Sequence, residues 1–152
     1  MYDQLKLDNQ LCFRFYTVSR LITQAYRPLL EPLGLTYPQY LVMLVLWEHD
    51  NQTVSEITQR LGLETNTVTP LIQRMEKAGL VVRTKGIVDS RQTLVSLTKH
   101  GQRLEHEARE IPECLVSNLL PSGTVPSAAQ VSQMAALLDN LIVTLRKAEQ
   151  TK

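Results

Sequence analysis

Apolar residues recur at helical spacing near both ends of the chain. The first series alternates steps of four and three residues and predicts an amphipathic helix that Pro28 and Pro32 end. This series comprises Leu11, Phe15, Val18, Ile22, Ala25 and Leu29. The second series has the same spacing, follows the loop-like stretch PSGTVPSAAQ, and comprises Val131, Met134, Leu138, Leu141 and Leu145. The apolar face of the first helix needs a partner to cover it.

The pattern in the middle of the chain indicates a helix-turn-helix. Thr36 is a suitable N-cap, and the apolar run that continues through Trp47 predicts a mostly buried helix. A short helix over residues 54–61, a glycine turn and a second helix that ends near residue 78 then form the helix-turn-helix. Because proline lacks a backbone donor, Pro70 is expected to bend the second helix or to delay its start.

Two β-rich runs follow in the stretch LVVRTKGIVDSRQTLVSLT, on either side of the polar turn VDSR. They predict a hairpin of the kind called a wing. Thr98 is a suitable N-cap for a further helix, which runs to a break at Pro112. The predicted fold class is therefore mainly α with a small β-hairpin wing, a winged helix-turn-helix.

The composition is that of a folded, soluble protein. Of the 152 residues, 43% are hydrophobic and 20% are charged. No uncharged apolar run approaches the roughly 18 residues that a membrane span needs, and the N-terminal MYDQLKLDNQ lacks the features of a signal peptide. We therefore expect a single cytoplasmic chain with no membrane partner, in which Cys12 and Cys114 are free thiols or redox centres.

Local charge indicates DNA binding, although the net charge of the whole chain is only +1. Between residues 74 and 91 there are five basic side chains and two acidic ones, a local net charge of +3. The second helix of the helix-turn-helix also offers short polar side chains that suit base edges and phosphates, and a wing-tip arginine suits a minor groove. The alternative is an ordinary solvated surface. The candidate DNA-binding residues are Thr65, Asn66, Thr67, Thr69, Gln73, Arg74, Lys77, Arg83, Lys85, Asp89 and Arg91.

The order of these elements, with Asp89 and Arg91 at the wing tip, resembles the MarR family of winged-helix regulators over essentially the whole chain. Within that family, the stretches QLCF, AYRPLLEPLGLTYPQYLVMLVLWE and TVTPLIQRMEKAGLV resemble the organic hydroperoxide regulators. The resemblance implies an obligate homodimer, with dimerisation helices in residues 1–35 and 112–152 and a DNA-binding lobe in residues 36–111. It also implies a repressor that needs no cofactor, binds a pseudo-palindromic operator while reduced, and leaves when an organic hydroperoxide oxidises a cysteine.

Cys12 is the candidate redox-sensing cysteine. Tyr16 follows it by one helical turn, so these two side chains can meet within one chain. Tyr26 lies about 21 Å further along the helix axis, and it would reach Cys12 only in a second copy whose first helix packs antiparallel. In the resembled regulators two tyrosines of the partner subunit meet the reactive cysteine, and the matching positions here are Tyr26 and Tyr37. Their hydroxyls would favour the reactive thiolate by hydrogen bonding.

The resemblance leaves two fates for an oxidised Cys12. Some of the resembled regulators form a mixed disulfide with a low-molecular-weight thiol, and others form an intersubunit disulfide with a second cysteine late in the chain. Cys114 lies in the region of that second cysteine. The alternative for each cysteine is a small hydrophobic residue buried in the core.

Other chemistry is weakly supported by the sequence. His49, His100 and His106 lack the spacing of a zinc site, and the chain has no glycine-rich phosphate loop and no Ser-His-Asp candidate. We therefore expect no metal and no enzymatic activity. Two alternatives stay open: a thiol peroxidase, which would consume hydroperoxide catalytically, and a MarR-type repressor gated by a phenolic ligand, in which Cys12 is incidental.

Overall fold

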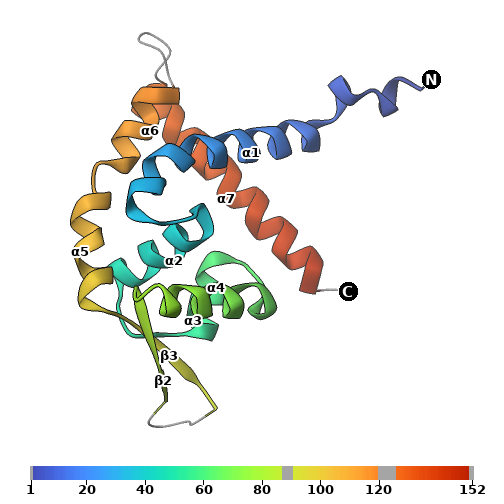
Figure 1. Cartoon of the computed structure of the whole chain (residues 1–152). Coiled ribbons are helices and arrows are strands. Elements are labelled where there is room, and N and C mark those ends of the chain that lie inside the picture. Colours follow the sequence, from blue (N-terminus) through green and yellow to red (C-terminus); the bar gives the residue numbers. More distant parts are fainter. Residues whose placement is uncertain (1, 87–90, 120–125, 151–152) are drawn as a thin grey trace. The chain divides into compact units, whose positions relative to one another are not determined.

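The computed structural model describes residues 2–86, 91–119 and 126–150 (Figure 1). It is mainly helical with a small antiparallel sheet, which confirms the predicted fold class. The chain divides into two compact units, Met1–Leu115 and Val116–Lys152. The division into dimerisation helices and a DNA-binding lobe stays a prediction.

The first unit begins with two single 3-10 turns, Asp3–Leu5 and Leu7–Asn9, and the long helix α1 (Leu11–Leu30). The predicted end at Pro28 is wrong, because Pro28 lies inside the last turn of α1. The carbonyl of Gln24 loses its helical N–H partner there, but Gln24 is exposed, so water can satisfy it. The helix gives way to the 3-10 turn Glu31–Leu33, which Gly34 ends in the left-handed conformation at φ +66.

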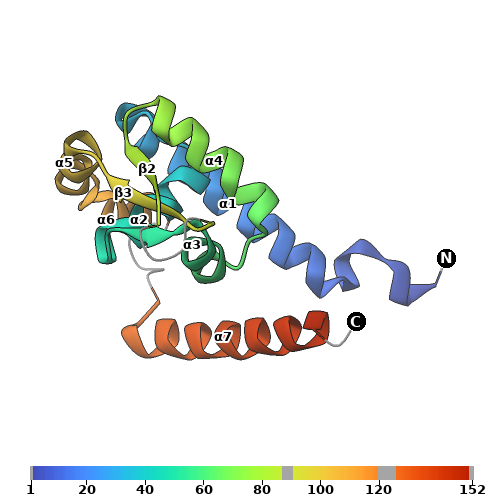
Figure 2. The same cartoon turned by 90° about the horizontal axis from the view of Figure 1, so that it is seen from below.

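The winged helix-turn-helix follows as predicted. Its helices are α2 (Tyr37–Glu48), α3 (Val54–Leu61) and α4 (Thr65–Lys77), and its strands are β1 (Gln52–Thr53), β2 (Val81–Lys85) and β3 (Thr93–Leu97). The strand order is β1-β3-β2, so β2 is an edge strand. The helix α4 and the β2–β3 hairpin lie on the same side of the lobe (Figures 1 and 2).

Pro70 does not delay the start of α4, which begins at Thr65. The absent N–H of Pro70 would have bonded to the carbonyl of Asn66 in the first turn, and Asn66 is exposed to water. The opposite face of α4 is buried in the core of the lobe through Val68, Ile72 and Met75. That face anchors α4 and leaves its polar side open.

A close junction connects the end of α4 to α5 (Lys99–Ala108). The Oγ1 of Thr98 accepts the Gly101 N–H at 3.0 Å, as predicted for an N-cap, and lies 2.6 Å from the carbonyl oxygen of Gly79. The indole Nε1 of Trp47 donates to the Gly101 carbonyl at 3.0 Å. A Cβ placed on Gly101 would lie 2.2 Å from the carbonyl oxygen of Leu80, so only glycine fits this junction.

The helix α6 (Ile111–Leu119) follows α5 after a break at residues 109–110. The predicted break at Pro112 is therefore two residues late. Pro112 is the second residue of α6, a position where a missing N–H costs no helical hydrogen bond.

The second unit contains α7 (Ala128–Gln150), whose described side chains are all exposed. Its apolar side chains, among them Leu137 and Leu141, keep between 37% and 68% of their surface. By length and composition Ala128–Glu149 could cross a membrane, with a mean hydropathy of 1.2 in its most apolar window. A helix that packs between the subunits of a soluble oligomer has the same properties.

Candidate functional site

Both cysteines are free and exposed in the single chain. The alternative in which each is buried in the core of the chain is therefore wrong. Cys12 is the second residue of α1, where the positive end of the helix dipole favours a negative charge. Cys114 lies in the first half of α6, and its backbone N–H donates to the Glu110 carbonyl at 3.0 Å. Both thiols are open to solvent-borne oxidants.

Tyr26 and Tyr37 lie together although α1 ends between them. Their ring centroids are 4.7 Å apart, and Tyr26 also lies 5.7 Å from Tyr40. Tyr40 in turn meets the edge of Trp47 at 6.2 Å. The result is a continuous row of aromatic rings from α1 through α2, which holds the two predicted sensor tyrosines in one place.

Burial raises the pKa of Tyr26 and of Tyr37, and for Tyr26 the neighbouring phenol of Tyr37 raises the pKa further. An upward shift from the usual value near 10 keeps both phenols protonated at neutral pH. Both hydroxyl groups are therefore available as hydrogen-bond donors under physiological conditions.

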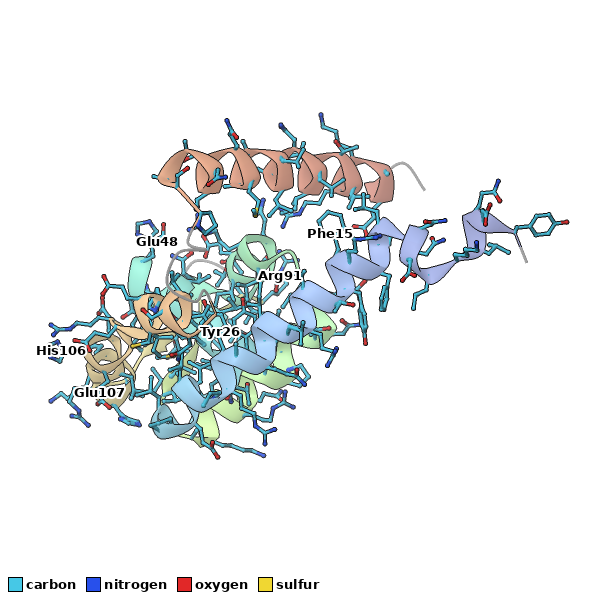
Figure 3. The ribbon with its side chains drawn as sticks, turned by 90° about the horizontal axis from the view of Figure 1, so that it is seen from above. Phe15, Tyr26, Glu48, Arg91, His106 and Glu107 are labelled. Atoms are coloured by element: carbon cyan, nitrogen blue, oxygen red, sulfur yellow. The ribbon has the colours of Figure 1, made fainter. Side chains whose placement is uncertain are left out.

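Cys12 and Tyr26 lie at opposite ends of one uninterrupted helix. Because α1 is helical from Leu11 to Leu30, about 21 Å of axis separates the two residues. Figure 3 shows Tyr26 where α1 meets the lobe, with Phe15 well along the helix toward its N-terminus. Tyr16 is one turn from Cys12 and is 65% exposed. The single chain thus separates the predicted thiol from its two predicted tyrosine donors.

The polar face of α4 carries the predicted DNA-binding residues. Those exposed on this helix are Thr65, Asn66, Thr67, Gln73, Arg74 and Lys77, while Thr69 is partly buried. On the wing, Lys85 and Arg91 are exposed, and Arg83 is partly buried beside α4. Asp89 lies outside the described residues. The structure therefore places the described members of this set on one helix and one hairpin.

A cavity of about 300 Å³ lies between α3, α4 and the wing. It brings Thr65, Thr69, Arg83 and Arg91 together with residues that the sequence analysis did not identify, namely Thr53, Val54, Ser55, Ile72, Gln92 and Thr93. Both α3 and α4 begin at this cavity, and the N–H groups at a helix start favour phosphate. The only sequence signal for the additional residues was the run of hydroxyl side chains at these helix starts.

Two further cavities lie in the first unit. One of about 560 Å³ adjoins Tyr37 and Arg27 between α1 and the start of α2. The other, of about 460 Å³, lies between α2 and α5 and is lined by Tyr40 and Trp47 together with Glu48, Glu105 and Arg109. Among the described residues no cluster of His, Cys, Asp or Glu could hold a metal ion.

Comparison with known proteins shows to which family the chain is related. The MarR family model matches residues 35–93. The organic hydroperoxide resistance transcriptional regulator of Bacillus subtilis is 40% identical over 146 residues, which cover 96% of each chain. The HTH-type transcriptional regulator MgrA of Staphylococcus aureus is 32% identical over 143 residues, which cover 93% of this chain and 94% of MgrA.

Among solved structures, reduced AbfR bound to DNA is 37% identical, with a TM-score of 0.78 and coverage of 96% of both chains. The disulfide-formed AbfR is 36% identical and gives a TM-score of 0.59, with coverage of 97% of this chain and 95% of AbfR. AbfR is a protein of Staphylococcus epidermidis.

Proposed function

Because this chain belongs to the MarR family, as a transcriptional regulator of the organic hydroperoxide type, we propose that it is a redox-sensing repressor. In this proposal a homodimer binds operator DNA while Cys12 is reduced and leaves the operator when an organic hydroperoxide oxidises Cys12. The chain acts in the cytoplasm and needs no cofactor. Relatives named as regulators support a regulator rather than a thiol peroxidase.

The pairing of Tyr26 with Tyr37 is the observation that carries the proposal. The two rings, 4.7 Å apart, hold protonated hydroxyls at the end of α1 that is far from Cys12. In a dimer with antiparallel α1 helices, the Cys12 end of one subunit meets the tyrosine end of the other. Each sensor would therefore be assembled from two chains, with Tyr16 beside Cys12 in the same helix.

Uncovered apolar surface supports the dimer. On α1, Leu11, Phe13, Phe15, Val18 and Leu21 are all exposed, and the only buried residue of this helix is Leu30. Monomeric soluble proteins rarely expose continuous apolar surface of this kind. A second copy that covers the α1 face, and likewise the α7 face, accounts for the amphipathic sequence of both helices.

The oxidation step follows from the chemistry of the thiolate. The sulfur of Cys12 attacks the terminal oxygen of the hydroperoxide, the O–O bond breaks, and the organic alkoxide leaves and takes a proton to become the alcohol. The sulfur loses two electrons and becomes a sulfenic acid. Exposed Phe13 and Phe15 favour an oxidant with an organic group over hydrogen peroxide.

A mobility-shift titration tests the proposed function. Palindromic DNA from beside the gene for this chain should be bound by the reduced protein and released after cumene hydroperoxide, and a dithiol should restore binding. Continued binding after oxidation would remove the redox mechanism. Release that requires a phenolic ligand instead of an oxidant would favour the ligand-gated alternative.

The wing should contribute strongly to operator binding. We expect Arg91→Ala to weaken binding by about 1–3 kcal/mol, because an arginine in a groove makes charge-assisted contacts that alanine cannot replace. Fluorescence anisotropy at a fixed salt concentration measures the effect, and size exclusion should show an intact dimer. The matched control is Arg103→Ala, at an exposed position on α5. Equal affinities of the two variants would place Arg91 outside the DNA interface.

Cys114 is proposed to resolve the sulfenic acid of the partner subunit's Cys12. Its thiol would displace water from the sulfenic acid and form an intersubunit disulfide. Non-reducing electrophoresis after peroxide treatment should show a covalent dimer in the wild type and none in Cys12→Ser or Cys114→Ser. If the wild type releases DNA but stays monomeric on this gel, a low-molecular-weight thiol is the partner of Cys12.

A further inference from the structure

We propose that Arg83 is not a DNA contact but a positioning residue, which Glu76 holds so that the wing keeps a fixed orientation relative to α4. The proposal rests on the DNA-binding function proposed above. It revises the expectation, drawn from charge alone, that Arg83 binds DNA. We refer to this pair as the Glu76–Arg83 clamp.

The clamp consists of three contacts to one carboxylate. Glu76 Oε1 accepts the backbone N–H of Arg83 at 3.1 Å, and Glu76 Oε2 accepts Arg83 Nε at 2.8 Å. The Nη2 of Arg83 lies 2.7 Å from the same Oε2. Both oxygens of the carboxylate are engaged, Oε1 by the backbone N–H and Oε2 by two guanidinium nitrogens, so its orientation relative to Arg83 is fixed at both oxygens.

The backbone contact makes this clamp a constraint on the strand. Arg83 is the central residue of β2 and pairs in register with Val95 of β3. Because β2 is an edge strand, the N–H groups that point away from β3 have no neighbouring strand to which they can donate a hydrogen bond. Glu76, in the last turn of α4, supplies an acceptor for one of them. The helix that carries the proposed base contacts is therefore bonded directly to the wing.

Arg83 also differs from the neighbouring basic residues in its exposure and in its ion pairing. The side chains of Arg83 and Glu76 are 31% and 35% exposed. The hydrogen bonds from Arg83 lower the pKa of Glu76, so this carboxylate stays ionised at neutral pH. In contrast, Arg74, Lys77 and Lys85 are exposed and make no ion pair among the described residues. Their charges are available to neutralise phosphates, whereas the charge of Arg83 is already neutralised.

Salt dependence distinguishes a phosphate contact from a positioning residue. Each phosphate that a basic side chain neutralises contributes about 0.9 to the slope of log affinity against log salt concentration. We expect Arg83→Gln to weaken operator binding about tenfold without changing this slope. Lys77→Gln is the matched control, one residue from Glu76. It should reduce the magnitude of this slope by about 0.9, because one phosphate contact is lost.

The variant Glu76→Ala removes every side-chain acceptor of the clamp, and the two possible roles of Glu76 predict opposite changes in operator affinity. Removing an acidic side chain next to a phosphate contact would strengthen DNA binding, because it removes a repulsion. Loss of the clamp should instead weaken binding about tenfold. The charge-swapped double variant Glu76→Arg/Arg83→Glu should bind the operator more tightly than is expected from multiplying the losses of affinity of its two single variants, because the swap restores the ion pair. Circular dichroism should show the same helix content in each variant.

Hydrogen exchange tests the clamp without DNA. The amide of Arg83 should exchange at least about tenfold faster in Glu76→Ala than in the wild type, since alanine offers no acceptor for this N–H. Unchanged exchange in Glu76→Ala would overturn the clamp. A tighter operator complex of Glu76→Ala, together with a smaller salt dependence of Arg83→Gln, would also overturn it. If the wild type binds no operator at all, the proposed function fails, and the exchange rate still decides whether the clamp orders the wing.

Discussion

Replacing Cys12 by serine is expected to give a repressor that folds and binds its operator but that organic hydroperoxides no longer release. The hydroxyl of serine is not oxidised by a hydroperoxide, so no sulfenic acid forms and no disulfide can follow. Cys12 is the second residue of α1, and serine differs from cysteine only by an oxygen in place of the sulfur, so the fold and the DNA-binding elements should be retained. The expected change is therefore a complete loss of response with operator affinity unchanged.

A titration with cumene hydroperoxide measures this result. The fraction of bound operator, followed by fluorescence anisotropy, should fall in the wild type after about one equivalent of oxidant per Cys12 and stay constant in Cys12→Ser. A thiol peroxidase would instead consume many equivalents in the presence of a reductant. Release of Cys12→Ser at the wild-type dose would assign the trigger to another group.

Tyr37→Phe provides a graded control for the same experiment. It removes one hydroxyl donor and keeps the ring that packs against Tyr26. Cys12 should therefore be oxidised more slowly, because its thiolate loses one charge-assisted hydrogen bond. Operator binding in the absence of oxidant should not change. A wild-type oxidation rate in this variant would limit Tyr37 to packing.

Gly101→Ala is expected to destabilise the protein, although alanine is the better helix former. In an open helix the exchange would stabilise by about 1 kcal/mol. Here the new methyl group would lie 2.2 Å from the Leu80 carbonyl oxygen, which also accepts the Thr98 N–H at 3.0 Å and so cannot move without losing that bond. Overpacking costs about 1–3 kcal/mol and sometimes more, and a 2.2 Å approach to a backbone oxygen that cannot move belongs at or above the upper end of this range. The cost therefore exceeds the helix-forming gain, and alanine should destabilise the protein.

Urea unfolding at a fixed subunit concentration measures this change. Gly34→Ala is the comparison, because a Cβ there meets nothing within 4 Å and only the left-handed backbone, at φ +66, opposes it. That conformational cost is about 1–2 kcal/mol. We expect Gly101→Ala to have the larger effect. A Gly101→Ala protein as stable as the wild type would contradict the close approach of α5 to Leu80.

Elements with a strong hydrophobic period could be predicted from the sequence, whereas features set by tertiary contacts could not. The helices α1 and α7 follow their apolar spacing, α3 and α4 follow the helix-turn-helix pattern around its glycine turn, and Thr98 caps α5 as its position suggests. The strand β1 has only two residues, too few to show alternation, and exists because β3 offers a free edge. Pro28 did not end α1, because water can satisfy the carbonyl that it leaves free.

The candidate site shows the same limit. Sequence spacing alone separated Cys12 from Tyr26, and it could not show that Tyr26 and Tyr37 would stack, since this depends on how α1 turns into α2. The cluster of basic residues was visible in the sequence, but the pairing of Arg83 with Glu76 depends on how close the wing lies to α4. A count of charges in the sequence therefore could not distinguish the paired Arg83 from the other basic side chains of this region.

Trp47 gives the protein an intrinsic optical reporter. It is the only tryptophan in the chain, its indole N–H is bonded to the Gly101 carbonyl of α5, and its ring meets Tyr40, which in turn contacts Tyr26. Indole emission depends on the polarity and hydrogen bonding around the ring, so a shift of α5 or of the tyrosines changes the emission maximum. Stopped-flow fluorescence of the unlabelled protein can therefore time how quickly a disturbance at the tyrosines reaches the junction between α4 and α5.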